Sequence, residues 1–257
     1  PMFKFIPYTL KTLWRHRSRT FLTVSGSAVA LFVFCFVGAV QEGMDDMQRR
    51  QAAKGSLVAF QANKFCPATS HLPQDYDQQI ARLDGVREVF PVQVFTNNCR
   101  ASLDVVVFYG VPPEKIRKAR DFELASGSWS EFENHQDAAV VGRAVANRRG
   151  IQVGDKFSMG EGSNQLSVNV AGIFTSDDPS EENYIYTHLE FLQRRRGLNL
   201  VGTVTQIEVL LNDGVDPIAI CREIDAKFRG GPVETDTRPK GVFQAKSLGD
   251  LTQLIGM

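Results

Sequence analysis

The chain has 257 residues, and its 29 lysine and arginine residues balance its 29 aspartate and glutamate residues, so the formal net charge is zero. Acidic and basic residues are interspersed, which excludes the strongly basic surface that is typical of nucleic-acid-binding proteins. The apolar content is ordinary, at 43% of the residues, and is enough for one or two compact domains with buried cores.

Residues 1–20 form a basic N-terminal segment in which apolar and basic side chains alternate. This pattern is typical of a helix that lies at the cytoplasmic interface of a membrane. The apolar members are Phe3, Phe5, Ile6, Leu10, Leu13 and Trp14, and the basic members are Lys4, Lys11 and Arg15. We therefore expect a cytoplasmic amphipathic segment that contacts the lipid bilayer.

Residues 21–40 form an uncharged run, FLTVSGSAVALFVFCFVGAV. At about 1.5 Å of rise per helical residue, this run spans roughly the 30 Å hydrocarbon core of a bilayer. Lysine and arginine crowd its N-terminal side, whereas Glu42, Asp45 and Asp46 follow it, and an excess of basic residues marks the cytoplasmic side. The run therefore predicts a transmembrane helix with a cytoplasmic N-terminus and a main domain on the far side of the membrane.

Two other interpretations of this run are a cleaved signal sequence and the core helix of a soluble protein. Residues 37–39 offer a small-residue cleavage site, but the run is longer than the usual apolar core of a signal sequence, about 7 to 15 residues. A soluble helix would carry polar residues on one face. Here only Thr23, Ser25 and Ser27 interrupt the run, and their hydroxyls can bond back to the carbonyl one turn earlier.

Small residues recur at a spacing of four in the first half of the run, where Thr23 precedes Ser27 and Gly26 precedes Ala30. Such a face lets a second helix backbone approach closely, so we expect helical neighbours in the membrane. Glycine and alanine are frequent in membrane helices in general, so the spacing identifies no particular partner.

Beyond the run, residues 41–56 are expected to form a polar stalk, helical to about residue 54. A short helix then has Tyr76, Ile80 and Leu83 on one face, and Gly85 ends it. Alternation and turn residues predict strands at 57–61, 86–95 and 103–111.

The end of the chain repeats this strand and helix order. Residues 204–211 alternate as a strand, Asp216 is a helix N-cap, and Pro217 occupies the first helical position. The predicted buried stripe of this helix is Ile218, Cys221, Ile224 and Phe228. Residues 233–235 are predicted to be a closing strand.

Two β-α-β units separated by a long middle section predict an α+β fold, a split βαβ or ferredoxin-like domain with a second subdomain inserted into it. The insert is expected to be small and rich in β structure, with a helix at 143–149. Its strands are predicted at 138–141, 156–159 and 168–174, and its turns at Gly150, Gly154, Gly160 and Gly162.

Several segments, in this order and spacing, resemble the MacB-type and FtsX-like family of ABC transporter permeases over nearly the whole chain. They are RHRSRTFLTVSGSAVAL at 15–31, QEGMDDM at 41–47, DGVREVFPV at 84–92, VVFYGVPPE at 106–114, AAVVGRAVANRRGIQVGDKF at 138–157 and VNVAGIF at 168–174. The matching part of such a permease is its first membrane helix and the extracytoplasmic core domain that follows.

The resemblance implies a porter-like α/β subdomain at 57–117 and 203–246, interrupted by a β-rich subdomain at 118–202. It also implies an inner (cytoplasmic) membrane location, an ATP-binding ABC subunit and a second permease protomer as partners, in a homo- or heterodimer, and allows a periplasmic adaptor as a further partner. ATP hydrolysis is expected in the separate ATPase subunit or domain, so no cofactor is expected here. The substrate is not implied, because the family moves or releases several kinds of cargo.

Family permeases carry three further membrane helices after the core domain, whereas no second apolar run of membrane length occurs in this chain. Residues 247–257 resemble the start of a second stalk helix. We therefore expect the chain to be a truncated permease.

Sequence motifs that are typical of catalytic sites occur in this chain only in incomplete form. Residues 150–156, GIQVGDK, lack the spacing of a phosphate-binding loop, and residues 126–128 lack the flanking glycines of a nucleophile elbow. His188 and Glu190 mimic the start of a deaminase signature without its cysteine segment. The histidines show no metal-ligand spacing; they are His16, His71, His135 and His188. No catalytic, cofactor-binding or metal-binding residue is predicted.

Two cysteines follow successive predicted strands, Cys66 after the first and Cys99 after the second, at what would be the same edge of the sheet. In an oxidising periplasm they could form a disulfide. The other interpretation is two unpaired thiols in loops.

Two classes of function remain open on the sequence. The first is a permease subunit whose external domain transmits ATP-driven motion to the export or release of a substrate. The alternative is a single-pass membrane-anchored periplasmic sensor or interaction module. An anchored enzyme has no residue constellation in its favour.

Overall fold

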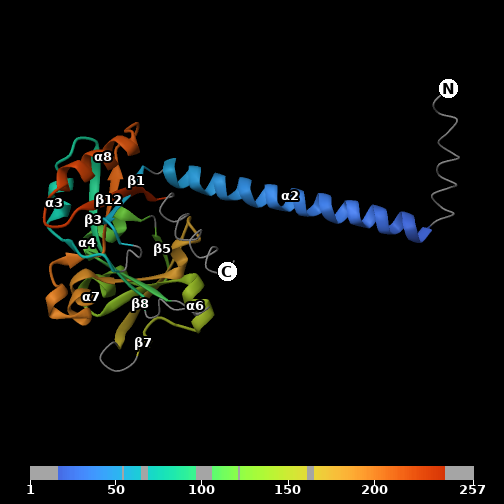
Figure 1. Ribbon diagram of the computed structural model, residues 1–257. Helices are drawn as coiled ribbons and strands as arrows, with labels where there is room; N and C mark the ends of the chain where they lie inside the picture. Colours follow the sequence, from blue (N-terminus) through green and yellow to red (C-terminus); the bar gives the residue numbers. More distant parts are fainter. Residues whose placement is uncertain are drawn as a thin grey trace. The chain divides into compact units, whose positions relative to one another are not determined.

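The structure is a computed structural model that describes residues 17–53, 55–64, 69–96, 106–120, 122–160 and 165–240 (Figure 1). The chain divides into two compact units, residues 1–50 and 51–257, which are described separately. The predicted interfacial segment before residue 17, the two cysteines of the predicted disulfide and the predicted second stalk segment lie outside the described residues.

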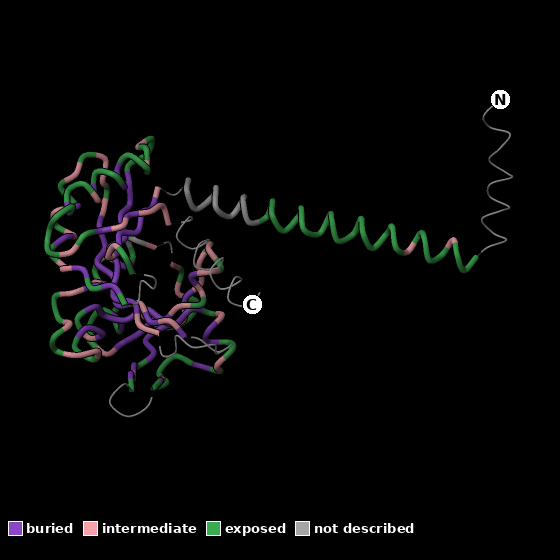
Figure 2. Tube along the Cα trace, in the orientation of Figure 1, coloured by how far each residue is buried: buried purple, intermediate pink, exposed green. Residues whose placement is uncertain are grey.

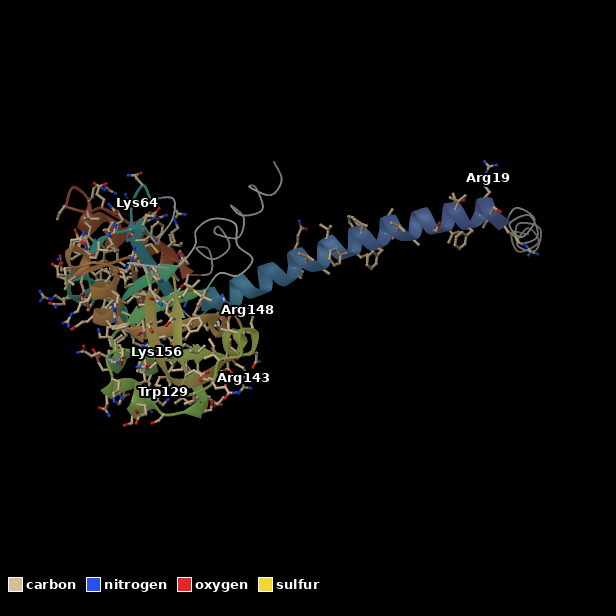
Figure 3. All side chains as sticks on the ribbon, turned by 90° about the horizontal axis from the view of Figure 1, so that it is seen from below. Arg19, Lys64, Trp129, Arg143, Arg148 and Lys156 are labelled. Carbon is tan, nitrogen blue, oxygen red and sulfur yellow. The ribbon has the colours of Figure 1, made fainter. Side chains whose placement is uncertain are left out.

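The described residues of the first unit lie in a long helix, α2 (Arg17–Ala53), which continues to the start of the second unit and has Arg19 near its beginning (Figure 3). Within it, Arg17–Gly43 is long and apolar enough to cross a membrane, with a mean hydropathy of 2.1. None of its most apolar window is buried within the chain, which opposes the interpretation as the core helix of a soluble protein. The hydroxyls of Thr23 and Ser25 bond back as predicted, since Thr23 Oγ1 donates to the carbonyl of Arg19 at 2.5 Å and Ser25 Oγ to that of Leu22 at 3.1 Å.

Helix α2 continues without a break from the apolar run into the polar sequence, as the predicted stalk requires. It ends at Ala53, and the first strand of the second unit, β1 (Ser56–Gln61), begins three residues later. The second unit consists of strands and shorter helices, and Figure 2 shows that most of its buried residues lie in its interior.

Four antiparallel strands form one part of the second unit. Their spatial order is β12 (Thr235–Pro239), β1, β11 (Gln206–Leu211) and β3 (Val86–Thr96). Helix α3 (Tyr76–Ile80) follows β1, and α8 (Pro217–Phe228) follows β11. This order is that of a split βαβ fold, so the predicted fold class is confirmed.

One hydrophobic core lies between these strands and their two helices. It includes Leu57 of β1, Ile207 of β11 and Ile224 of α8, all fully buried. The rings of Tyr76 and Phe228 stack between the helices at a centroid distance of 3.9 Å. A two-stranded sheet, β2 (Leu72–Pro73) with β10 (Thr203–Val204), lies outside the main sheet.

The helix near the end of the chain begins as predicted, because the Asp216 side chain accepts from the amide of Ile218 at 3.0 Å. The predicted buried stripe is wrong at Ile218, which is 45% exposed; Ile220 is buried instead. As the second residue after the cap, Ile218 lies on the outer side of the first turn. The closing strand also begins at Thr235, two residues later than predicted.

Strand β3 joins the two parts of the sheet. Its first half pairs with β11, and its second half, from Gln93 to Thr96, pairs with β4 (Val107–Val111). The order beyond β4 is β9 (Tyr184–His188), β6 (Ala138–Gly142), β8 (Leu166–Ser176) and β5 (Phe122–Gly127), and β7 (Lys156–Met159) pairs with β8. The inserted residues therefore extend the same sheet, which has ten strands in the part of the chain that the structure describes. The predicted bounds of the two subdomains stay a prediction.

The middle of the extended part of the sheet is buried on both faces. In β6, Ala139 and Val141 belong to one core and Ala138 and Val140 to another, which explains the continuous apolar sequence AAVV. Its short helices are α4 (Pro113–Ala119), α5 (Trp129–Asn134), α6 (Arg143–Arg149) and α7 (Leu189–Arg196), and its 3-10 turns are η4 (Glu181–Asn183) and η5 (Leu198–Leu200). The predicted helix at 143–149 and the three predicted strands of the insert are observed.

Candidate functional site

The motifs that the sequence analysis set aside have structural roles. Ser128 caps α5 by accepting from the amide of Ser130 at 3.2 Å. Gly150 ends α6 with a φ of 66°, and Asp155 then accepts from the amide of Gln152 at 2.8 Å, which closes the turn into β7. Among the described residues, no three His, Cys, Asp or Glu side chains form a group that could hold a metal ion.

Four charged side chains meet inside the second unit, and we call Arg120, Glu181, Glu208 and Lys240 the buried charge cluster. Arg120 Nη2 lies 2.5 Å from Glu208 Oε2, and Arg120 Nε lies 3.2 Å from Glu181 Oε2. Lys240 Nζ lies 2.9 Å from Glu181 Oε1 and 3.5 Å from Glu208 Oε2. The four side chains are only 2% to 16% exposed.

Neighbouring polar groups complete the hydrogen bonding of the cluster. Tyr186 Oη donates to Glu181, and Gln206 Nε2 donates to the remaining oxygen of Glu208 at 3.1 Å. Two carboxylates thus face two cations, and each carboxylate oxygen has a donor. Such complete pairing is what a buried ion pair needs to offset its desolvation cost.

The cluster shifts the pKa of its members. Burial alone would raise the pKa of Glu181, but Arg120 and Lys240 outweigh it and lower that pKa to about 2. The same two cations lower the pKa of Glu208 against the effect of burial. Burial, followed by the charge of Glu181, raises the pKa of Tyr186 well above its usual value. Both glutamates are therefore ionised at neutral pH, and Tyr186 stays a hydrogen-bond donor.

The cluster links the two parts of the sheet. Glu208 lies on β11 and Lys240 follows β12 in the four-stranded part, whereas Arg120 follows α4 and Glu181 lies on η4 in the extended part. The sequence analysis missed all four residues. Their only sequence signal is a glutamate inside an apolar strand, which alternation alone places on a solvent face.

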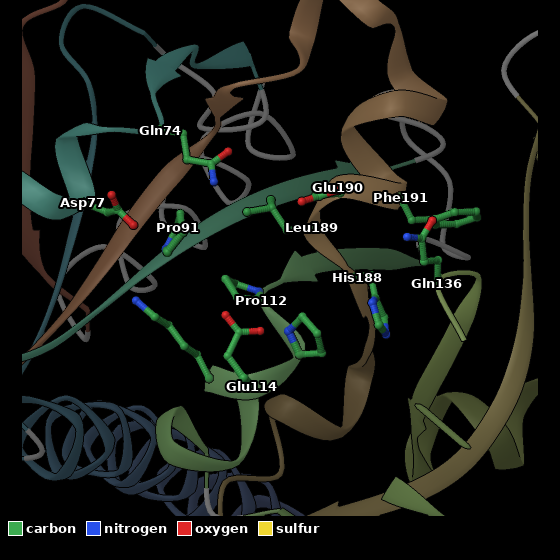
Figure 4. A pocket seen from close by; sticks show the side chains of 12 residues that line it. Gln74, Asp77, Pro91, Pro112, Glu114, Gln136, His188, Leu189, Glu190 and Phe191 are labelled. Carbon is green, nitrogen blue, oxygen red and sulfur yellow. The ribbon is translucent and has the colours of Figure 1, made fainter. Parts of the chain in front are cut away.

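A cavity of about 380 Å³ opens where the same two parts meet (Figure 4). Two adjacent parallel strands end at it, since β4 leads into Pro112 and β9 ends at His188, and the register pairs Val111 with His188. The carboxyl ends of parallel strands are where ligands usually bind in α/β sheets. The lining residues are Gln74, Asp77, Pro91, Pro112, Pro113, Glu114, Lys115, Gln136, His188, Leu189, Glu190 and Phe191.

The cavity has polar walls with unused hydrogen-bonding capacity. Asp77 Oδ1 is buried and has no hydrogen-bond partner, and burial raises the pKa of this carboxyl, against a hydrogen bond from Gln78 and the charge of Lys115. His188 is 8% exposed, and its Nε2 lies 2.6 Å from the carbonyl of Phe132. A carbonyl only accepts, so Nε2 carries a hydrogen, and Nδ1 is the nitrogen that can accept when it carries none.

Residues 20–227 match the sequence model of a protein family, the MacB-like periplasmic core domain. No curated protein matches the chain.

Three solved structures have a similar fold at low sequence identity. The periplasmic region of MacB from Actinobacillus actinomycetemcomitans is 11% identical with a TM-score of 0.54, over 78% of this chain and 95% of that one. The extracellular domain of the noncanonic ABC-type transporter YknZ from Gram-positive bacteria is 13% identical with a TM-score of 0.50, over 71% of this chain and 99% of that one. A domain of a putative permease protein from Porphyromonas gingivalis is 11% identical with a TM-score of 0.50, over 73% of this chain and 91% of that one.

The matched residues include most of α2 and nearly the whole described sheet, from β1 to β11, and the similarity covers well over half of the chain. The chain therefore belongs to the family of MacB-like periplasmic core domains of ABC transporter permeases.

Proposed function

We propose that the chain is part of a permease subunit of an ABC transporter, in which α2 crosses the inner membrane and the second unit lies outside the cytoplasm. In this proposal a separate ATPase subunit binds and hydrolyses ATP, and the permease transmits the resulting motion to the external domain. The motion drives the export or release of a substrate. A second permease protomer completes the transporter, and a periplasmic adaptor is a further partner that the family permits.

The continuity between α2 and β1 is the observation that carries this proposal. The helix runs unbroken from its apolar part to Ala53, and only residues 54 and 55 separate it from β1. Strand β1 pairs on both sides, with β12 and with β11. A displacement of the helix along its axis is thus applied to an inner strand of the sheet, where hydrogen bonds on both edges resist local distortion.

The buried charge cluster supports the same mechanism. A sheet that transmits motion needs its two parts to move together, and Arg120 and Glu181 of one part are held to Glu208 and Lys240 of the other. The basic residues before the apolar run and the acidic residues after it support the proposed direction across the membrane.

The test is expression of the intact gene with its candidate ATPase, followed by purification in mild detergent through a tag on the permease. We expect the ATPase to copurify and its hydrolysis rate to depend on the permease. Failure to copurify under conditions where the permease is folded would contradict the proposal. It would favour the alternative function, a single-pass anchored sensor or interaction module, which needs the same membrane helix but no ATPase.

The direction is tested separately by adding protease to sealed cells. We expect the second unit to be digested from outside while a tag at the N-terminus stays protected. Protection of the second unit would mean that the chain lies the other way round.

A further inference from the structure

The cavity between the two parts of the sheet has an acidic lining. Asp77, Glu114 and Glu190 contribute carboxylates, and Lys115 is the only lysine or arginine among the lining residues. Its charge is already engaged, because Lys115 Nζ donates to the carbonyl of Val89 at 2.9 Å and lies 3.9 Å from Glu88.

The three carboxylates differ in what they already bind. Glu190 is paired with Arg194 at 3.1 Å. Among the described residues, neither Asp77 nor Glu114 has an ion-pair partner, and Asp77 Oδ1 has no hydrogen-bond partner although it is buried. A buried acceptor without a donor costs free energy, so a ligand that supplies an N–H group there gains stability.

The opposite wall also offers an acceptor. His188 is more than nine-tenths buried, its Nε2–H group is fixed by Phe132, and its Nδ1 makes no hydrogen bond to any residue that the structure describes. In Figure 4, Asp77 and Gln74 lie on one side of the opening, His188 and Gln136 lie on the other, and Glu114 lies between them. The polar groups thus come from separate elements and surround one space.

The rest of the lining is hydrocarbon. Pro91, Pro112 and Pro113 present rigid rings, and Leu189 and Phe191 add an aliphatic and an aromatic side chain. A volume of about 380 Å³ is within the usual range of small-ligand sites. The lining therefore suits a ligand with an alkyl part and a cationic N–H group, and it repels anions.

We propose that this cavity binds an alkylammonium group, with Asp77 and Glu114 as its ion-pair partners and the proline rings against its hydrocarbon chain. His188 Nδ1 accepts a hydrogen bond from the polar part of the same ligand. The group belongs either to a free organic amine or to a lysine side chain of a peptide. This inference does not depend on an ATPase partner, so it stands or fails independently of the proposed function.

The experiment uses the full chain in lipid nanodiscs and saturation-transfer NMR. The first probe is n-butylammonium, and n-butanol is its uncharged match, an analogue of similar size. The second probe is acetyl-Gly-Lys-Gly-amide, and its uncharged match is the same peptide with Nε-acetyllysine. We expect a charged probe to bind and its uncharged match to bind at least about tenfold more weakly, since a hydrogen bond to a charged group is worth roughly that ratio or more. If butylammonium binds, a free organic amine is sufficient for binding. If only the lysine peptide binds, the alkylammonium group of the ligand belongs to a peptide.

Substitutions of the lining residues test whether the probe binds in the cavity. Asp77→Asn and Glu114→Gln keep the shape of the side chain and remove its charge, and each is expected to weaken binding about tenfold. Glu223→Gln is the control, because Glu223 is exposed on α8 and does not line the cavity. The ¹⁵N resonance of His188 Nδ1 is expected to shift on addition of the binding probe. Unfolding curves of the variants verify that they are folded.

Four results would overturn the inference. The first is no binding of either charged probe, and the second is equal binding of charged and uncharged probes. The third is a loss of affinity in Glu223→Gln as large as in Asp77→Asn. Competition of inorganic phosphate for the same site would also overturn it, because an anion cannot replace an ammonium group between two carboxylates.

Discussion

Arg120 and Glu208 stand 88 positions apart in the sequence, and Arg120 Nη2 donates to Glu208 Oε2 at 2.5 Å. The pair crosses the boundary between the four-stranded part of the sheet and its extension. Lys240 and Glu181 complete the buried charge cluster around it. The charges are balanced only as a set, so the removal of one member leaves an uncompensated charge in the interior.

Replacing Arg120 with methionine should destabilise the second unit by about 3 to 5 kcal/mol, because two buried carboxylates would then share Lys240 alone. The measurement is urea unfolding followed by tryptophan fluorescence. Arg194→Met is the matched control. Arg194 and Glu190 are 57% and 70% exposed, so the loss of that pair should cost less than about 1 kcal/mol. Equal effects of the two substitutions would show that the cluster contributes nothing beyond a surface pair.

Stability should fall on acidification through the same cluster. The pKa of Glu181 is lowered from 4.5 to about 2, and that of Glu208 is also lowered. A carboxyl with a depressed folded-state pKa stabilises the fold above its unfolded pKa, and this contribution is lost as the pH falls towards the folded pKa. The free energy of unfolding should therefore decrease between pH of about 4.5 and about 2.

The control for this pH dependence is the Arg120→Met variant, in which the main cause of the lowered pKa values is absent. Its unfolding free energy should change less over the same pH range. A slope identical to that of the unmodified chain would assign the acid sensitivity to other carboxyl groups.

The elements that the sequence predicted well carry their own local signals. Gly150 ends α6 in the left-handed conformation, and Asp216 and Pro217 begin α8, so both helices are marked at a terminus. The alternation of apolar residues in β11 and the apolar run of β6 mark both segments as strands. Strand β9 and the start of helix α7 were not predicted, because residues 184–190 carry no side-chain cap and no clear apolar period.

The buried charge cluster and the cavity could not be predicted from local sequence signals. In β11, Ile207 and Val209 face the core beneath α8, so alternation places Glu208 on the opposite face, as if in solvent. It is 2% exposed because the extended part of the sheet covers that face. The position of the cavity likewise depends on the pairing of β4 with β9, which is a contact between segments far apart in the sequence. His188, first weighed as part of an enzyme motif, is held by Phe132 in the cavity wall.

A close backbone approach at Gly142 makes another prediction. A Cβ atom added there would lie 2.2 Å from the carbonyl oxygen of Glu182, which is backbone and cannot turn aside. Gly142→Ala should therefore destabilise the second unit by about 1 to 3 kcal/mol in thermal or urea unfolding. Gly43→Ala is the control, because nothing lies within 4 Å of its added Cβ. An unchanged unfolding curve for Gly142→Ala would mean that β6 and η4 can separate at little cost.

The membrane helix is tested by a charge at its centre. Leu31 lies within the apolar run and is 65% exposed in the chain, so no packing within the chain is lost when it is changed. Leu31→Arg should cost about 2.5 to 3.5 kcal/mol of insertion free energy, and much of the variant should be released from membranes by alkaline carbonate. Leu31→Ala, which stays apolar, should remain in the membrane fraction. If the unmodified chain is itself released, or if mass spectrometry finds a new N-terminus just after residue 39, the run is a cleaved signal sequence. In that case the second unit has no helix through which motion could reach it.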